Sequence, residues 1–408
     1  MSGQKPREIA ARVLQQRQTG EAFTETLLER ALVRANLSAA DRGLCQELVY
    51  GVVRWQATLD WLIARKTQGR TQKAGLQSVL RLGLYQIFWL DRVPDHAAVH
   101  ESVELARRNG FGPQAGFVNA VLRAYVREAE SIRKSLFELR SAQPALGCSH
   151  PAWLVERWQA RWGKEQTRRL LEWNNTPPKT FARVNTLKTD AGHLLELWRE
   201  EGVEYDFFPR PWYGENLVFE LKSHPPLARL PSFQQGFFYI QDPSTLLAVG
   251  ELNAQPGEAI LDLCAAPGGK TTYLAQLVKN EARIVAADVS SDRLKLVQEN
   301  CARLGVTCVF AQPEIRNPKS EIRPGLTPPG HEQFDRVLVD APCSNTGVMR
   351  RRVDLRWRLQ AEEIDRLRAT QLALLGQAAN RLRTGGTLVY STCSLESEEN
   401  GNVVQGFL

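Results

Sequence analysis

Hydrophobic positions in the first third of the chain recur at three- and four-residue spacing. Leu44, Leu48 and Val52 form one such series. This period places apolar side chains along one face of an α-helix, whereas a strand would alternate every second residue. Because no strand-type alternation occurs before residue 140, residues 1–140 are predicted to form an all-α domain.

The pattern becomes mixed after residue 140. The stretch SAQPALGCSH (141–150) reads as a linker, and helical spacing returns from Leu154 to Trp173 and over Ala191–Tyr205. Short apolar runs between and after these helices are typical of strands. A small α+β module is therefore expected over residues 141–235, with strands near 181–188, 217–221 and 237–241.

From residue 236 to residue 408, fully apolar runs bounded by turns alternate with helical stretches. Strands that are apolar on both sides, separated by helices, indicate a parallel sheet covered on both faces, a Rossmann-like α/β fold. The expected strands are 259–264, 283–289, 307–311, 336–341 and 387–393, and the expected helices are 270–278, 291–304 and 361–382.

Composition limits the class of protein. Hydrophobic residues make up 43% of the chain and charged residues 24%, which is typical of globular proteins. No run reaches the ~18 apolar residues of a membrane span, and the first residues lack the apolar core of a signal peptide. Seven cysteines without a CxxC pair, and six scattered histidines, favour reduced thiols and give no support for a metal site. A cytoplasmic protein without metal or membrane contact is expected.

The positive charge is concentrated at the amino-terminal end. Residues 1–150 contain 21 Lys and Arg against 14 Asp and Glu, while the remainder is balanced at 31 of each. A basic helical domain beside a neutral one indicates a nucleic-acid docking module joined to a catalytic domain. The alternative is a solvated basic surface without a partner.

The stretch LDLCAAPGGKTT joins the first expected strand of the α/β domain to its helix. It lacks the first glycine of a phosphate-binding P-loop, and the dinucleotide motif GxGxxG is absent. A turn of small residues lets the backbone approach a ligand closely, as S-adenosylmethionine requires. The residues of this turn are Cys264, Ala265, Ala266, Pro267, Gly268, Gly269 and Lys270.

An acid follows the second expected strand. Asp288 ends RIVAAD about 20 residues after the glycines, where an acid commonly binds ribose hydroxyls. It could instead cap the next helix, but Ser290 or Ser291 can serve that purpose. Asp262, inside the first strand, is expected to orient the loop or the cofactor amine.

Two cysteines follow the fourth and fifth expected strands, Cys343 in DAPC and Cys393 in YSTCS. In a doubly wound sheet both strand ends open onto the crevice that holds the cofactor. A thiolate that adds to carbon 6 of a pyrimidine makes carbon 5 nucleophilic, and an acid such as Asp340 can stabilise the charge on the ring. Spacing alone leaves open which thiol adds, or whether both are core residues.

Several motifs together resemble those of the Nop/Sun family of RNA (cytosine-5)-methyltransferases. The motifs are LDLCAAPGGKT, DAPCSNTGVMRR and YSTCSLESEEN in the α/β domain. Earlier stretches resemble the NusB-like RNA-binding domain and middle region of the family's bacterial ribosomal branch: ELVYGVVRW, LGLYQI, VPDHAAVHESVELA, GFVNAVLR, RVNTLK and GFFYIQDPST. The likeness covers nearly the whole chain. It implies methyl transfer from S-adenosylmethionine to a cytosine of 16S ribosomal RNA by a monomer.

The resemblance also implies a division of labour. Cys393 is the expected nucleophile, Cys343 assists release of the methylated base, and Asp340 contacts the cytosine and lies near the cofactor. Asp288 holds the ribose, and residues 264–270 line the cofactor. Arg350, Arg351 and Arg352 are candidates for phosphate contacts, against a reading as solvated charge.

Two departures from the family pattern carry expectations of their own. Glu314, in AQPEIR, stands where the family has an aspartate near the adenine. The chain ends at Leu408, where the family continues through further strands, so an exposed sheet edge and weakened activity are expected. The alternatives are therefore a catalytically impaired RNA-binding assembly factor, or a methyltransferase acting on transfer RNA or DNA.

Overall fold

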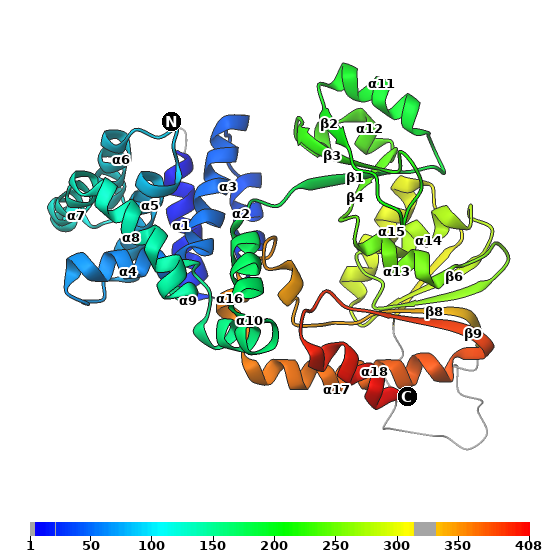
Figure 1. The fold of residues 1–408 in the computed structure, drawn as a ribbon. Coiled ribbons are helices and arrows are strands. Elements are labelled where there is room, and N and C mark those ends of the chain that lie inside the picture. Colours follow the sequence, from blue (N-terminus) through cyan, green and yellow to red (C-terminus); the bar gives the residue numbers. More distant parts are fainter. Residues whose placement is uncertain (1–4, 21, 314–331) are drawn as a thin grey trace. The chain divides into compact units, whose positions relative to one another are not determined.

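The computed structural model describes residues 5–20, 22–313 and 332–408. The chain forms two compact units, whose elements are labelled in Figure 1. The first unit comprises the chain up to Pro177 together with Val348–Leu359, and the second comprises Pro178–Gly347 and Gln360–Leu408. The chain therefore leaves the second unit after Gly347, contributes a short segment to the first, and returns at Gln360.

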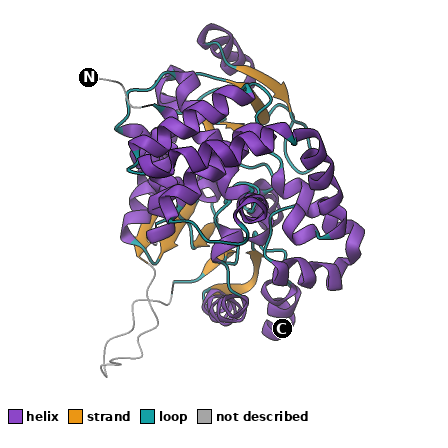
Figure 2. Ribbon diagram, turned by 90° about the vertical axis from the view of Figure 1, so that its left-hand side faces the viewer, coloured by secondary structure: helices purple, strands orange, loops and turns teal. Residues whose placement is uncertain are grey.

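The described elements of the first unit are helical, which confirms the all-α prediction for its first 140 residues. Figure 2 distinguishes the described helices, in purple, from the strands, in orange. Leu48 and Val52 on α3, and Leu80 and Leu84 on α5, are almost completely buried. Burying each such side chain stabilises the fold by roughly 1.5–3 kcal/mol. The helices are α1 (Pro6–Thr19), α2 (Thr24–Val33), α3 (Ala39–Arg54), α4 (Gln56–Thr67), α5 (Ala74–Trp89), α6 (Asp95–Arg108), α7 (Ala115–Arg127) and α8 (Ala129–Ala142).

The prediction of a linker at 141–150 is wrong. This stretch forms the short helix α9 (Pro144–Gly147), and Cys148, Ser149 and His150 after it are buried in the first unit. The following helix, α10 (Ala152–Asn175), belongs to the same unit and matches the helix expected there. A linker was expected because Pro and Gly usually mark loops, but here the proline occupies the first turn of a helix, where its missing N–H costs nothing.

Arg356 explains why the segment Val348–Leu359 packs on the first unit. This guanidinium is completely buried on the short helix α16 (Leu355–Arg358). It donates to the backbone carbonyls of Arg54, Ser149 and Asn174 at 3.1 Å. Because burial disfavours the charge, the pKa of Arg356 falls to about 9.

The second unit contains an antiparallel sheet with strand order β2-β3-β1-β4, packed on α11 (Ala191–Glu201) and α12 (Pro231–Gln234). The helix predicted over Ala191–Tyr205 ends four residues early, because Gly202 adopts the left-handed conformation that closes helices. Strand β2 begins at Glu204 instead. The strands are β1 (Thr180–Val184), β2 (Glu204–Phe207), β3 (Val218–Ser223) and β4 (Phe238–Ile240).

The same unit contains the predicted parallel sheet, with strand order β7-β6-β5-β8-β9. Its order reverses between β5 and β8, which makes the carboxyl ends of these strands the usual place for a ligand. The strands lie within a few residues of their predicted positions: β5 (Ala259–Leu263), β6 (Arg283–Asp288), β7 (Val309–Pro313), β8 (Phe334–Asp340) and β9 (Leu382–Ser391).

Helices cover both faces of the parallel sheet (Figure 1). Ile260 and Leu338 face α13 (Thr245–Leu252), α14 (Gly269–Leu277) and α15 (Ser291–Leu304). Their neighbours Leu261 and Val337 face α17 (Ala361–Asn380) and α18 (Gly401–Phe407). Burial on both faces explains why the strands read as continuous apolar runs.

A buried arginine joins the two sheets of the second unit. Arg183 on β1 lies between the rings of Tyr239 and Tyr273, with its guanidinium carbon 5.4 and 5.0 Å from their centroids. It donates to Gln241 at 2.5 Å and to the carbonyl of Gly269, the first residue of α14, at 3.1 Å. The antiparallel sheet is thereby fixed to the start of the helix that follows the glycine-rich turn.

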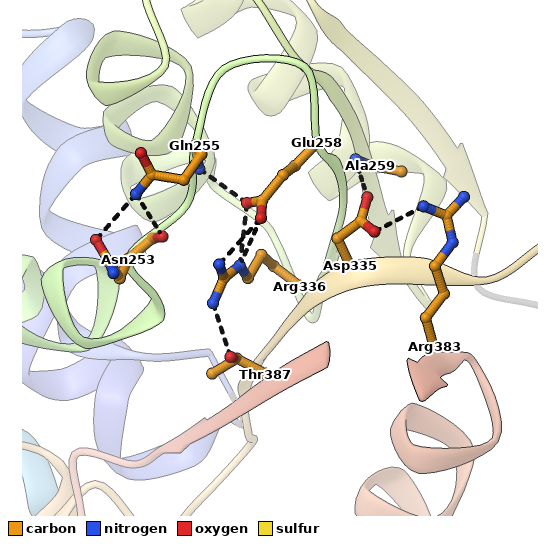
Figure 3. Close-up of polar contacts among 8 residues, drawn as sticks. All are labelled: Asn253, Gln255, Glu258, Ala259, Asp335, Arg336, Arg383 and Thr387. Carbon is orange, nitrogen blue, oxygen red and sulfur yellow. Dashed lines mark hydrogen bonds and ion pairs between the residues drawn. The ribbon is translucent and has the colours of Figure 1, made fainter. Parts of the chain in front are cut away.

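The amino ends of the parallel strands are fastened by ion pairs, drawn in Figure 3. Glu258, just before β5, accepts from the guanidinium of Arg336 on β8 at 3.0 Å. Asp335 accepts from the N–H of Ala259 at 2.8 Å and from Arg383 at 2.6 Å. The charged side chains named here at the amino ends of the strands are therefore paired with one another.

Candidate functional site

The glycine-rich turn after β5 has a backbone that few residues can adopt. Cys264 and Gly268 have φ values of +63° and +100°, and the bond between Ala266 and Pro267 is cis. A Cβ on Gly268 would lie 3.3 Å from the Cα of Val297 on α15. Glycine at this position therefore serves both the turn and the close approach of α15.

Asp288 lies at the carboxyl end of β6, beside this turn. It is almost completely buried and accepts from the N–H groups of Ala266 at 3.2 Å and Ser290 at 3.0 Å. Ser290, rather than Asp288, caps α15 by accepting from the N–H of Arg293. The helix-cap reading of Asp288 is therefore wrong, while its binding to ribose stays a prediction.

Asp262, on β5, is a completely buried carboxyl group under the same turn. One oxygen accepts from the Thr271 hydroxyl at 2.6 Å, and the other has no hydrogen-bond partner within the described residues. Burial raises the pKa of Asp262 to about 7, the bond from Thr271 opposes this rise, and the charge of Asp340 adds to it. An unpartnered buried oxygen is costly, so this site is suited to an additional donor such as the amine of a ligand.

Asp340 links three elements at the carboxyl edge of the sheet. It ends β8, pairs with Lys270 of α14 at 2.5 Å, and accepts from the hydroxyl of Ser391 at the end of β9 at 3.0 Å. These contacts bring Lys270 of the glycine-rich turn, the DAPC motif and the strand before Cys393 into one place. The roles of Asp340 and Lys270 toward a substrate or cofactor remain predictions.

The two predicted thiols are neighbours. The sulfur atoms of Cys343 and Cys393 lie 3.3 Å apart, and Cys393 is the more exposed. The Cys393 thiol also donates to Oδ1 of Asn345 at 2.9 Å. The hydrogen bond to Cys393, and next to it burial, raise the pKa of the Cys343 thiol far above its ordinary value. The assignment of Cys393 as the nucleophile and of Cys343 as its helper remains a prediction.

Hydrogen bonds join the two loops that carry these thiols. The Gly347 N–H donates to the carbonyl of Cys393 at 2.9 Å, and the Leu395 N–H donates to the Thr346 hydroxyl at 2.8 Å. A Cβ at Gly347 would lie 2.7 Å from the Cys393 carbonyl oxygen, so a larger residue there would separate the loops.

Asn345 and Glu399 were not predicted from the sequence. Asn345 lies two residues after Cys343, has a positive φ of 59°, and contacts both thiol-bearing residues. Glu399 is completely buried behind the thiols, although SLESEEN reads as a polar surface turn. The sequence feature that could have indicated Glu399 is the acid-rich turn directly after β9 and Cys393.

The remaining predicted contacts are those of Glu314 and of the arginines 350–352. Glu314 lies outside the described residues. Arg350 packs within the first unit, where its guanidinium carbon lies 4.1 Å from the centre of the Trp173 ring and its Nε donates to the carbonyl of Pro177 at 3.2 Å. Phosphate binding by residues 350–352 remains a prediction.

Three family models match the chain. They are the NusB family over residues 4–127, an RsmF/B-like ferredoxin-like domain over 150–219, and the 16S rRNA methyltransferase RsmB/F over 249–408. The probable ribosomal RNA small subunit methyltransferase B of Bacillus subtilis (strain 168) is 36% identical over 98% of this chain and 88% of its own length. Ribosomal RNA small subunit methyltransferase B of Klebsiella pneumoniae subsp. pneumoniae is 36% identical over 98% and 89%. The crystal structure of PH0851 matches with a TM-score of 0.76 and 25% identity, covering 99% of this chain and 90% of that one.

The parallel sheet, with a glycine-rich turn and paired thiols at its carboxyl edge, defines a Rossmann-like methyltransferase domain within the second unit. A NusB-like domain and a ferredoxin-like module precede it. The chain belongs to the 16S rRNA methyltransferase RsmB/F family. No helix among the described residues is long and apolar enough to cross a membrane.

Proposed function

We propose that this protein transfers a methyl group from S-adenosylmethionine to carbon 5 of a cytosine in 16S ribosomal RNA. The observation that carries the proposal is the pair of thiols, 3.3 Å apart, beside the acids and the small-residue turn at one sheet edge. The named relatives act on small-subunit ribosomal RNA, which supports the substrate.

The residues present fit the cofactor. The unpartnered oxygen of Asp262 can accept from its amine, Asp288 can accept from its ribose, and the turn at Gly268 lets the backbone approach. When bound, the cofactor supplies an electrophilic methyl group. Lys270 pairs with Asp340, and Asp340 would hydrogen-bond to the cytosine ring.

The thiols would divide the remaining work. The Cys393 thiol, oriented by Asn345, gives its proton to solvent, and its sulfur bonds to carbon 6 of the cytosine while the π bond between carbons 5 and 6 breaks and its electron pair makes carbon 5 nucleophilic. After carbon 5 has taken the methyl group, water accepts the proton of that carbon, the electron pair of the broken carbon–hydrogen bond forms the double bond between carbons 5 and 6, and the bond from carbon 6 to Cys393 breaks with its electron pair returning to the sulfur. Cys343, whose sulfur lies against that of Cys393, assists this release.

Methyl transfer to unmodified 16S rRNA tests the proposal with three single variants. Cys393→Ala should lower turnover by roughly 10⁴-fold or more, because it removes the attacking atom. Cys343→Ala should accumulate a protein–RNA adduct that survives denaturing electrophoresis. Cys308→Ala, a buried cysteine of the same unit, should behave as wild type.

Bisulfite sequencing of the product locates the methyl group and separates the rivals. Methylation of transfer RNA or DNA alone would replace the proposed substrate. RNA binding without any methyl transfer would favour an assembly factor, and full turnover by Cys393→Ala would refute the assigned roles.

A further inference from the structure

A buried carboxylate joins the two loops that carry the thiols. One oxygen of Glu399 accepts from the N–H of Ser344 at 2.8 Å, and the other accepts from the hydroxyls of Ser344 and, at 2.5 Å, Ser394. Each of these serines directly follows a thiol-bearing residue, Cys343 or Cys393. Glu399 therefore contacts both loops one residue beyond each sulfur.

A glutamine on α17 extends this contact to the other side of Cys343. The side-chain amide of Gln371 donates to Glu399 at 3.0 Å and to the carbonyl of Pro342 at 2.9 Å. Glu399 and Gln371 thus hold the backbone immediately before and after Cys343. Both side chains are completely buried, so water does not compete for these bonds.

The donors named above are all neutral, so no positive charge among them offsets the cost of burying the carboxylate. The position therefore favours a side chain whose two oxygens both accept hydrogen bonds. Moving a charge out of water costs several kcal/mol, and hydrogen bonds offset only part of that cost. A carboxylate accepts but does not donate, so both serine hydroxyls must turn their protons toward it. An amide of the same shape has only one acceptor oxygen, so its NH2 group must face either the two serine hydroxyls or the N–H donors of Ser344 and Gln371.

We infer that Glu399 is a positioning residue: it holds the Cys343 and Cys393 loops together, so that the two sulfurs stay in contact for adduct formation and release. This inference rests on the proposed function for its catalytic consequence. The effect on thiol geometry stands on the bonds of Glu399 alone and can be measured without RNA.

Glu399→Gln is the main test, with Glu258→Gln as the matched control. Glu258 is a carboxylate of the same unit bonded to Arg336 at the opposite edge of the sheet (Figure 3). Thiol positioning is measured by binding of phenylarsine oxide, because its arsenic must bond two sulfurs at once. Cys343→Ser gives the baseline for the remaining cysteines.

The arsenical should bind about ten-fold more weakly to Glu399→Gln than to wild type, because the sulfurs are no longer preorganised. Misplacement of a reacting group should also lower kcat for methyl transfer by about 100-fold. The KM for S-adenosylmethionine should stay within about two-fold of wild type, since the hydrogen bonds described for Glu399 run to Ser344, Ser394 and Gln371 and not to the turn at 264–270. Glu258→Gln should lose thermal stability and leave arsenical binding and kcat unchanged.

Glu399→Gln that binds the arsenical and turns over like wild type overturns the inference. So does a variant that loses stability alone, since that result marks a purely structural residue. Should Glu399→Gln fail to fold, Ser394→Ala removes one arm of the contact and should weaken arsenical binding about three-fold; wild-type binding by it refutes the inference. Absence of methyl transfer by wild type refutes the proposed function, while arsenical binding still decides the positioning role.

Discussion

The two edges of the parallel sheet use their acids in opposite ways. At the amino edge, Glu258 and Asp335 pair with Arg336 and Arg383 (Figure 3). At the carboxyl edge, Asp262 keeps an oxygen without a partner within the described residues. The pairs at the first edge therefore stabilise the sheet, while the second edge retains one unsatisfied carboxyl oxygen, on Asp262, as sites that bind and react commonly do.

The largest expected difference between the two edges is in the turnover of variants that lack an acid at one edge or the other. Asp340→Ala should lower kcat for methyl transfer by about 10³-fold, because the variant loses the group proposed to stabilise charge on the cytosine ring and releases Lys270. Single-turnover kinetics on unmodified RNA measure this loss. Asp335→Ala, five residues earlier on the same strand, is the control and should retain kcat at a temperature where it is folded. Equal losses in the two variants would contradict the assignment of chemistry to one edge.

The next effect is the pH dependence of stability. Asp262 has its pKa raised from 3.8 to about 7, so the folded state holds a proton that the unfolded state releases. This contribution to stability is fully present below about pH 4 and is lost as the pH rises from 4 through 7, by a total of roughly 4 kcal/mol. Urea denaturation of wild type and Asp262→Asn between pH 4 and pH 8 measures it. As the pH rises, the free energy of unfolding of Asp262→Asn should increase relative to that of wild type.

Asp335, at the amino edge, should show the opposite sign. The N–H of Ala259, and next to it Arg383, lower the pKa of Asp335. Its stabilising contribution is therefore present above the unfolded pKa and is lost as the pH falls through the lowered value. Asp335→Asn should lose stability relative to wild type at pH 7 and approach it in acid. A parallel pH trend in Asp262→Asn and Asp335→Asn would refute the electrostatic contrast.

A smaller loss of stability is expected when Arg336, the less exposed arginine of the amino edge, is replaced. Arg336→Met should lower the free energy of unfolding by about 2 kcal/mol, because Glu258 and Thr387 lose their shared donor while partly shielded from water. Chemical denaturation at pH 7 measures this. Arsenical binding by the two thiols should be unchanged, and a weakened arsenical complex would show that the edges are not independent.

Periodicity was sufficient for the parallel sheet because its strands are buried on both faces. Ile260 and Leu261 point to opposite faces, yet both are covered by helices, so the strand reads as one apolar run. Pro and Gly wrongly indicated a linker at 141–150, where the buried Ser149 accepts from Arg356, more than two hundred residues later. Such distant polar contacts have no local signature in the sequence.

The candidate site, like the fold, was predicted from the sequence only in part. Cys343, Cys393 and Asp340 follow strands whose carboxyl ends meet at one edge, so their proximity follows from the topology. The role of Glu399 could not be predicted, because a run of acids beside a turn is usually solvated. Its partners are distant in the sequence, since Gln371 on α17 donates both to Glu399 and to the carbonyl of Pro342 before Cys343.

The smallest effect concerns the exposed ion pair of the amino edge. Arg383 is half exposed, in contrast to Arg336, and its bond to Asp335 spans only 2.6 Å. Solvent screens such a pair, so Arg383→Met should cost about 0.5 kcal/mol at low salt and less at 1 M salt. Asp335 keeps its bond from the Ala259 N–H in this variant, which limits the loss. Denaturation at two salt concentrations checks this, and a loss as large as that of Arg336→Met would show that exposure does not set the strength of the pairs at this edge.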